Sequence, residues 1–265
     1  MSNKKTSGGF TLIVSALAII ICLVLGIIVY MVILGDPGNF DADGHPKPGN
    51  LMGVMYKGGF IVPILLGALF TVICFFFERL ITINKAAGKG QVDKFVSKIK
   101  QLVAAKDFDG AIAECDKQQG SLGNVVREGL TKYQFVQNDA SMDKESKVAA
   151  ISKALEEATA LELPMLSKNL SVISTCASIG TLVGLIGTVV GMINAFSALS
   201  AAGAPDTSKL ATGISEALVN TLVGILTSAL AIMAYNFFST RVDGITYAMD
   251  EAGFSIIQEF QASGK

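Results

Sequence analysis

The sequence has very little histidine and cysteine. His45 is the only histidine in 265 residues. A catalytic triad with a histidine base, or a zinc enzyme with histidine ligands, is therefore hard to build from this chain. Four cysteines occur without any CxxC pair, so we expect buried thiols rather than a disulfide framework or a metal site. They are Cys22, Cys74, Cys115 and Cys176.

Charge is also scarce. Only 16% of the residues are charged and 51% are hydrophobic, whereas a soluble domain typically has about 25% charged residues. The formal net charge of −1 gives no reason to expect a nucleic acid partner. The composition predicts an integral membrane protein surrounded by lipids.

Four apolar stretches are long enough to cross a bilayer, which takes about 20 predominantly apolar residues. They lie at 10–34, 59–83, 169–200 and 210–238. The first is longer than the apolar core of a cleaved signal peptide, which is about 7–15 residues, so we expect a retained span. The fold prediction is all-α, with four transmembrane helices and a helical cytoplasmic domain.

Polar segments separate these spans. Basic residues gather near residues 1–9, 84–168 and 239–265, which the positive-inside rule places in the cytoplasm together with both termini. The loop at 35–58 and the turn at 201–209 then lie on the opposite side. Asp41, Asp43 and His45 in the loop provide an incomplete ligand set, and turn chemistry explains them better than a metal site.

Helical periodicity continues through the polar domain. It predicts helices at 91–105, 108–115, 122–135 and 141–168, and an extension of the last span through residues 239–265. No break separates 141–168 from the span that follows, so one helix should run on into the membrane, bent at Pro164. One apolar side of this helix carries Val148, Ile151, Leu155, Ala158, Leu161 and Leu166. The apolar side of the extension carries Val242, Ile245, Met249, Ile256 and Phe260.

The last two spans carry stripes of small and hydroxyl residues. The first stripe is Ser174, Ser178, Thr181, Gly184, Thr188, Gly191 and Ala195. The second is Gly213, Glu216, Asn220, Thr221, Gly224, Thr227, Ser228 and Ala231. Such a stripe either lets another helix approach closely or lines a polar path. Gly180, Gly184, Gly187, Gly191 and Gly224 are the candidates for close packing.

Glu216 is the only carboxylate well inside an apolar span. A charged carboxyl costs about 2.5–3.5 kcal/mol at the centre of a bilayer on insertion scales, so this side chain should face protein or water. Its two interpretations are a hydrogen bond that holds helices together and a role in an ion path.

Three motifs in this region resemble the ExbB/TolQ/MotA family. They are GLIGTVVGMINAF at 184–196, GISEALVNTLVG at 213–224 and AYNFF at 234–238. The residues of the second motif resemble ExbB and TolQ more than MotA. The resemblance implies a channel-forming subunit of an ion-driven motor in the bacterial inner membrane. It also implies a homo-oligomeric ring, typically a pentamer, and no enzymatic activity or cofactor.

The partner implied is an ExbD-like protein with a single span that carries a membrane aspartate. This fits a chain that has no aspartate within its own spans. Thr188 and Thr221 match the two threonines that line the family's ion path, and Glu216 matches the glutamate of its GIAEAL-type motif. The expected path also includes Thr181, Asn220 and Ser228.

The chain departs from the family at two points. Thr181 and Leu230 stand where the family often has proline, and there are four spans where ExbB and TolQ usually have three. MotA has four, so a TolQ-like or MotA-like stator is the alternative to an ExbB-like subunit that acts with a TonB-like protein. Protons are the expected ion on family grounds, although the many hydroxyl oxygens also suit Na⁺. A lipid-binding scaffold and a membrane enzyme are the competing function classes.

Overall fold

A computed structural model describes residues 7–137, 139–201 and 207–262. Lys4, Lys5 and most of the expected turn at 201–209 lie outside the described residues. Within the described ranges, all regular structure except one isolated bridge between Phe40 and Pro46 is helical. Four helical stretches are long and apolar enough to cross a membrane. These observations confirm the all-α prediction with four apolar spans.

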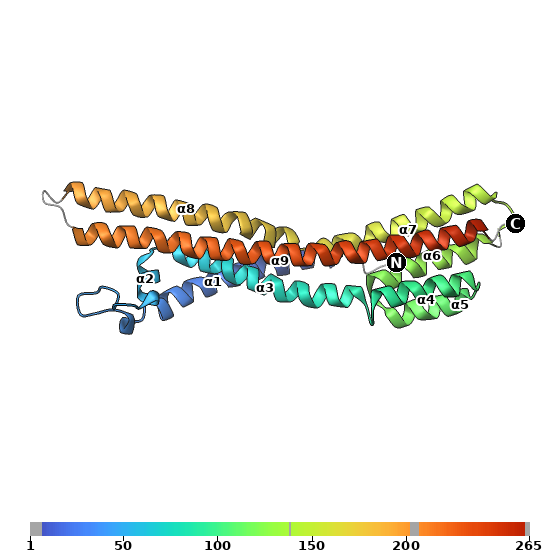
Figure 1. Ribbon diagram of the computed structural model, residues 1–265, viewed down its shortest axis with the longest axis horizontal. Helices are drawn as coiled ribbons and strands as arrows, with labels where there is room; N and C mark the ends of the chain where they lie inside the picture. The colour runs from blue at the N-terminus through green and yellow to red at the C-terminus, as the bar shows by residue number, and fades with distance from the viewer. Residues whose placement is uncertain (1–6, 138, 202–206, 263–265) are drawn as a thin grey trace. The chain divides into compact units, whose positions relative to one another are not determined.

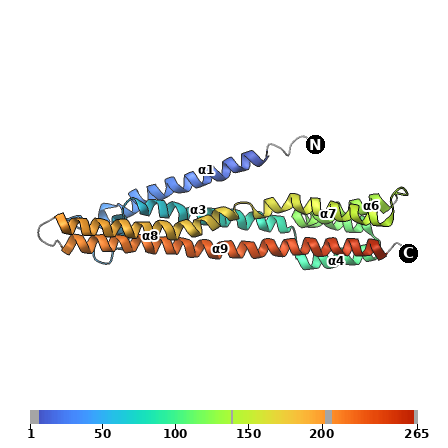
Figure 2. The same cartoon turned by 90° about the horizontal axis from the view of Figure 1, so that it is seen from above.

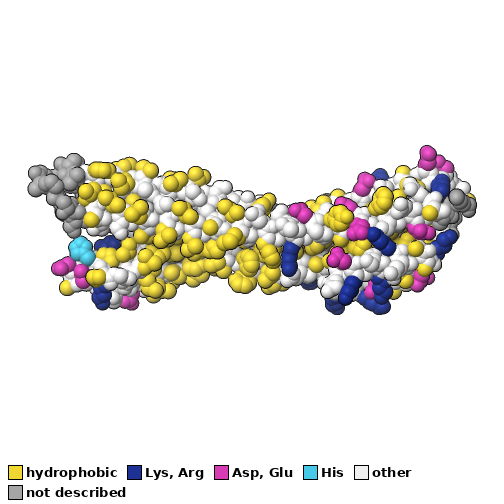
Figure 3. Space-filling view, in the orientation of Figure 1, with side chains coloured by type: hydrophobic (Ala, Val, Ile, Leu, Met, Phe, Trp, Pro, Cys, Tyr) yellow, Lys and Arg dark blue, Asp and Glu magenta, His cyan; other side chains and the backbone are white. Residues whose placement is uncertain are grey.

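The chain divides into two compact units. The first unit comprises residues 1–77 and 169–236, and the second comprises 78–168 and 237–265. Helices α3 (Ile61–Ala87) and α9 (Thr207–Ala262) contribute to both units. On the face of the first unit seen in Figure 3, hydrophobic side chains predominate, as expected for a surface in contact with lipid.

The first unit is built around a hairpin of two helices. Helix α8 (Leu170–Ala201) and the first part of α9 lie side by side in both views (Figures 1 and 2). Helix α1 (Ser7–Ile28) continues as a π-helix, η1 (Val29–Leu34). The hydrophobic cluster of Ile61, Leu65, Val219 and Val223 joins α3 to α9.

The segment at 35–58 is more structured than the loop that the sequence predicts. It contains a short 3-10 helix, η2 (Pro37–Asn39), and helix α2 (Leu51–Lys57). Asn50 caps α2, because its side-chain oxygen accepts hydrogen bonds from the N–H groups of Met52 (3.0 Å) and Gly53 (3.2 Å). The carboxylate of Asp41 accepts the backbone N–H of His45 (2.8 Å), which is turn chemistry.

The second unit is a bundle of helices with an apolar core. It contains α4 (Val92–Ala104), α5 (Phe108–Gln118), α6 (Gly120–Gln137), α7 (Lys144–Ser167) and the end of α9. The ring of Tyr133 lies at the centre, with centroids 4.3 Å from Phe108 and 4.8 Å from Phe260. All five apolar residues predicted for the extension at 239–265 are buried, which confirms that face.

Helix α7 does not run on into α8, so the predicted continuous helix is wrong. Lys168 adopts an extended conformation (ψ 143°) and Asn169 a left-handed one (φ 60°). Asparagine tolerates positive φ better than most residues, which lets it end a helix where no glycine is present. Arg79, which is buried, donates to the last carbonyls of α7, those of Met165 (3.3 Å) and Leu166 (3.4 Å).

Two smaller predictions are also wrong. Leu161 is 74% exposed rather than part of the apolar side of α7. It lies six residues after the buried Leu155, which is about 120° around a helix of 3.6 residues per turn. Cys74 is exposed on the outer side of α3, beside the exposed Ile73, whereas the three other cysteines are buried.

Candidate ion pathway

The seam between α8 and α9 is formed by glycines. A Cβ atom added to Gly224 would lie 2.9 Å from the Cα atom of Gly184, and one added to Gly180 would lie 2.9 Å from the carbonyl oxygen of Gly224. Such distances are too short for a real side chain. Gly187 faces Asn220 and Gly191 faces Ala217 in the same way. All five glycines that the sequence singles out therefore pack α8 against α9 within one chain.

Two threonine hydroxyls meet across this seam. The Oγ1 atoms of Thr188 on α8 and Thr221 on α9 are hydrogen-bonded to each other. Each oxygen also lies within hydrogen-bond distance of a backbone carbonyl, Thr188 Oγ1 at 3.4 Å from that of Ala217 and Thr221 Oγ1 at 3.4 Å from that of Gly184. Because a hydroxyl has one hydrogen, one threonine donates to the other and the second donates to the backbone. Both residues are half-buried, so the pair lies at the edge of the seam rather than in its interior.

A second hydroxyl pair lies two turns along the seam. Thr181 donates to the hydroxyl oxygen of Ser228 at 2.8 Å. Ser228 is buried and Thr181 half-buried. Ser174 and Ser178, which the helical pattern places on the same stripe, are exposed in the chain. The polar stripe thus combines contacts within the seam with hydroxyls that face outward.

Asn220 is buried and tied to the segment before α3. Its side-chain amide donates to the carbonyl oxygen of Gly58 at 3.0 Å, and only 3% of the residue is exposed. Among the residues that the structure describes, the side-chain oxygen of Asn220 has no hydrogen-bond partner. Leaving a buried acceptor unpaired costs about 1–3 kcal/mol, so the position of Asn220 is enforced by its surroundings.

Glu216 lies one helical turn before Asn220 on α9 and is half-buried. Its charge interacts with that of Lys57, the last residue of α2. The sequence did not predict that Lys57 and Gly58 lie near Glu216 and Asn220. No periodic signal links them to α9, because Gly58 and Asn220 are 162 residues apart in the chain.

The site has the parts of a path for a small cation. It combines one carboxylate with hydroxyl and amide oxygens, and oxygen atoms are the groups that bind protons and hard cations. No group of three or more His, Cys, Asp or Glu in the part of the chain that the structure describes is arranged to hold a metal ion.

The sequence of this region matches a known family model. The model describes the MotA/TolQ/ExbB proton channel family, and it matches residues 117–251. The chain belongs to the MotA/TolQ/ExbB family. The match includes the whole of α8 and the part of α9 that carries Glu216, Asn220 and Thr221. Members of this family are proton channel subunits, which agrees with the resemblance found in the sequence.

Individual relatives carry two different names. A Tol-Pal system protein TolQ of Haemophilus influenzae is 36% identical over 123 residues, which is 46% of this chain and 54% of the relative. TolQ of Pseudomonas aeruginosa is 28% identical over 138 residues, 52% of this chain and 58% of the relative. A biopolymer transport protein ExbB of Pseudomonas putida is 24% identical over 163 residues, 61% of this chain and 48% of the relative. This chain thus spans about half the length of the relatives it matches.

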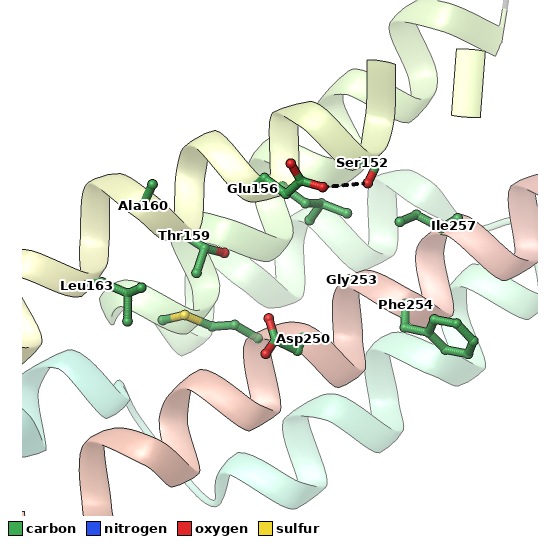
Figure 4. A pocket seen from close by; sticks show the side chains of 11 residues that line it. Ser152, Glu156, Thr159, Ala160, Leu163, Asp250, Gly253, Phe254 and Ile257 are labelled. Carbon is green, nitrogen blue, oxygen red and sulfur yellow. Dashed lines mark hydrogen bonds between the residues drawn. The ribbon is translucent and has the colours of Figure 1, made fainter. Parts of the chain in front are cut away.

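The second unit contains a separate groove between α7 and α9 (Figure 4). It has a volume of about 370 Å³, and its lining includes Leu155, Leu163, Met249 and Phe254. At this groove, the Ser152 hydroxyl donates a hydrogen bond to the Glu156 carboxylate at 3.0 Å (Figure 4). None of the residues expected in the ion path lines this groove.

Proposed function

We propose that this chain is the channel subunit of an inner-membrane motor that uses the proton motive force. In this proposal it works as a homopentamer around an ExbD-like partner and energises transport across the outer membrane through a TonB-like protein. Both termini lie in the cytoplasm. Family membership supports the channel role, while the partner, the stoichiometry and the outer-membrane system are parts of the proposal.

The pair of hydroxyls at Thr188 and Thr221 carries the proposal. Packing alone does not require threonine at these two positions, because glycine and alanine pack as closely, and both threonines are half-buried rather than enclosed. A half-exposed pair can instead exchange a hydrogen bond with a carboxyl group of the partner, or with a bridging water, in surroundings of low dielectric constant. The half-buried Thr181, whose hydroxyl donates to that of Ser228, adds a second hydroxyl pair along the same seam.

Protons are the ion that we propose. Hydroxyl groups can relay a proton along hydrogen bonds, and the family model describes a proton channel. Na⁺ is the alternative, because the hydroxyl oxygens of Thr188, Thr221 and Ser228 also suit a hard cation. Loss of activity after replacement of Na⁺, with the proton gradient held constant, would favour that alternative.

A TolQ-like role in maintaining the cell envelope is the second candidate. It is favoured by the relatives named TolQ, which match this chain with up to 36% identity. A MotA-like motility role rests only on the number of spans. Deletion of the gene separates these functions, because each predicts a different loss.

The experiment is a clean deletion in the native host, complemented with the full-length chain. We expect loss of growth on a substrate that requires energised outer-membrane import, with normal detergent resistance and motility. Detergent sensitivity with normal import would support the TolQ-like role instead. A tagged chain purified from the complemented cells should carry a partner with one transmembrane segment containing aspartate, identified by mass spectrometry.

A further inference from the structure

Residues 29–58 form a structured cap, here called the collar. The ring of Tyr30 stacks on that of Tyr56 at 4.7 Å, and the Tyr30 hydroxyl donates to the Tyr56 carbonyl at 2.8 Å. The side chain of Asn39 donates to the carbonyls of Ile33 (2.9 Å) and Leu34 (3.0 Å). These contacts join the end of η1 to α2, so the collar has a defined shape rather than that of a free loop.

The collar is docked on the helix that carries Glu216. The amide of Asn220 donates to the carbonyl of Gly58, the residue that ends α2. Gly58 has no space for a side chain, because an added Cβ would lie 2.6 Å from Val62 and 3.1 Å from the side-chain oxygen of Asn220. Val54 and Met55 of α2 pack against the apolar cluster formed by α3 and α9.

This docking places Lys57 in the neighbourhood of Glu216. Lys57 precedes Gly58 directly, and Glu216 lies one turn from Asn220 on the same face of α9. The Lys57 ammonium is held 5.8 Å from the centroid of the Phe40 ring, which lies within the collar. Both charged side chains are half-buried, and their charges interact.

We propose that Lys57 acts as an electrostatic brake at the entrance of the ion path. Glu216 attracts incoming cations, and the positive charge of Lys57, which the collar holds in its neighbourhood, offsets that attraction. The proposal rests on the ion-conducting function proposed above. It assigns a purpose to the segment between the first two spans, which is to limit passive entry of cations.

The size of the effect follows from electrostatics. A single charge near a partly buried entrance changes the local potential by about one kT, which corresponds to about a threefold change in local cation concentration. The Debye length falls from about 30 Å at 0.01 M salt to about 4 Å near 0.5 M, so high salt should screen most of the effect.

The test measures passive proton uptake into membrane vesicles from the native host, under an imposed potassium diffusion potential. The host carries the wild-type gene or one of four variants, namely Lys57→Gln, Lys57→Arg, Glu216→Gln and the double variant. At low salt we expect Lys57→Gln to raise the uptake rate about threefold. Glu216→Gln should lower it, the double variant should return it toward wild type, and Lys57→Arg should leave it unchanged. High salt should remove most of the differences.

Lys47→Gln is the matched control. Lys47 belongs to the same segment, but its side chain is exposed and donates to the carbonyl of Gly38 at 2.8 Å. An unchanged or lower rate in Lys57→Gln, or an equal increase in Lys47→Gln, would overturn the brake. Both comparisons require that vesicles with the wild-type protein take up protons.

A second measurement separates failure of this inference from failure of the proposed function. The melting temperatures of the purified full-length single and double variants form a double-mutant cycle. The cycle measures whether Lys57 and Glu216 interact, and it does not depend on ion flow. Coupled melting temperatures without conduction in wild-type vesicles would reject both the channel function and the brake, leaving a purely structural ion pair. Conduction with additive melting temperatures and an unchanged Lys57→Gln rate would reject the brake alone.

Discussion

Two hydroxyl groups provide the most direct test of the ion path at the scale of single residues. Replacing Thr188 or Thr221 by valine keeps the shape of the side chain and removes its oxygen. We expect each variant to assemble with the partner and to lose motor function about tenfold or more, because a hydrogen bond to a charged group such as the partner's carboxylate is worth about 1.5–3 kcal/mol. Growth on a substrate that needs energised import measures the loss.

Thr175→Val is the control for this test. Thr175 lies on the same helix as Thr188, but it is exposed and its hydroxyl donates to the carbonyl of Ser171 within that helix, at 2.7 Å. We expect wild-type growth for this variant. Wild-type growth of both Thr188→Val and Thr221→Val would show that the seam only packs helices, as the scaffold interpretation requires.

Cys115 supplies a prediction that depends on pH. Burial, together with the negative charge of Asp116, raises the pKa of this thiol to about 12 from an ordinary value of 9.0. Since the thiolate is the reactive form, alkylation of folded protein at pH 8 should be about a thousandfold slower than that of a free thiol. Mass spectrometry after a timed maleimide reaction measures this rate, and denaturation should abolish the protection.

The same pKa shift predicts the alkaline stability of the chain. As pH rises above 9, Cys115 loses its proton in the unfolded chain, whereas the folded chain keeps it until about pH 12. The free energy of unfolding should therefore be unaffected by Cys115 below pH 9, and it should decrease as the pH rises from 9 to about 12. Cys115→Ala should lack this decrease. An identical alkaline decrease in the variant would assign the effect to other groups.

At the scale of helices, Arg79 holds the end of α7. Its guanidinium donates to Glu78 at 2.6 and 2.5 Å, as well as to the last carbonyls of α7. Lysine keeps the charge but cannot form this fork. We expect Arg79→Lys to reduce the free energy of unfolding by about 2 kcal/mol, less than for a fully buried pair because Glu78 is partly exposed. A lower melting temperature of the full-length Arg79→Lys variant in detergent, compared with wild type, would show this loss of stability.

Arg127→Lys is the matched control for Arg79. The Arg127 guanidinium lies 3.2 Å from the Asp116 carboxylate, and both side chains are more than half exposed. Exposed ion pairs contribute little, about 0–1 kcal/mol, so this variant should melt close to wild type. Equal melting temperatures for Arg79→Lys and wild type would contradict a role for Arg79 at the helix end.

The helices and the seam were predictable because their signals are local. Apolar periodicity gave α4, α5 and α6 to within a few residues. Spacings of three and four placed small and hydroxyl residues on one stripe of each of the last two spans, but left open what each stripe would face. The break at Asn169 was missed because a helix end at asparagine has no strong sequence signal. The contact of Asn220 with Gly58 was missed because it joins residues 162 positions apart.

At the scale of the whole molecule, the packing glycines leave the outer faces of the hairpin for other partners. Leu182, Leu185, Ile186 and Val189 on α8 are exposed, as are Leu218 and Leu222 on α9. We expect these faces to contact lipids, neighbouring copies or the partner in a homo-oligomeric ring. Native mass spectrometry of the full-length chain in mild detergents should show one oligomer, typically five copies. Monomers in every detergent would contradict the ring.

The bond between Asn220 and Gly58 also constrains how the protein can be made. Gly58 is synthesised long before Asn220. The hydrogen bond between them therefore cannot form until the whole intervening chain has been made. The α8–α9 hairpin closes locally, because Gly180 and Gly224 lie on consecutive helices and pack against each other. The collar can dock only after that hairpin has been inserted. During biogenesis, the proposed ion path is therefore formed before Lys57 takes the position in which we propose that it limits cation entry.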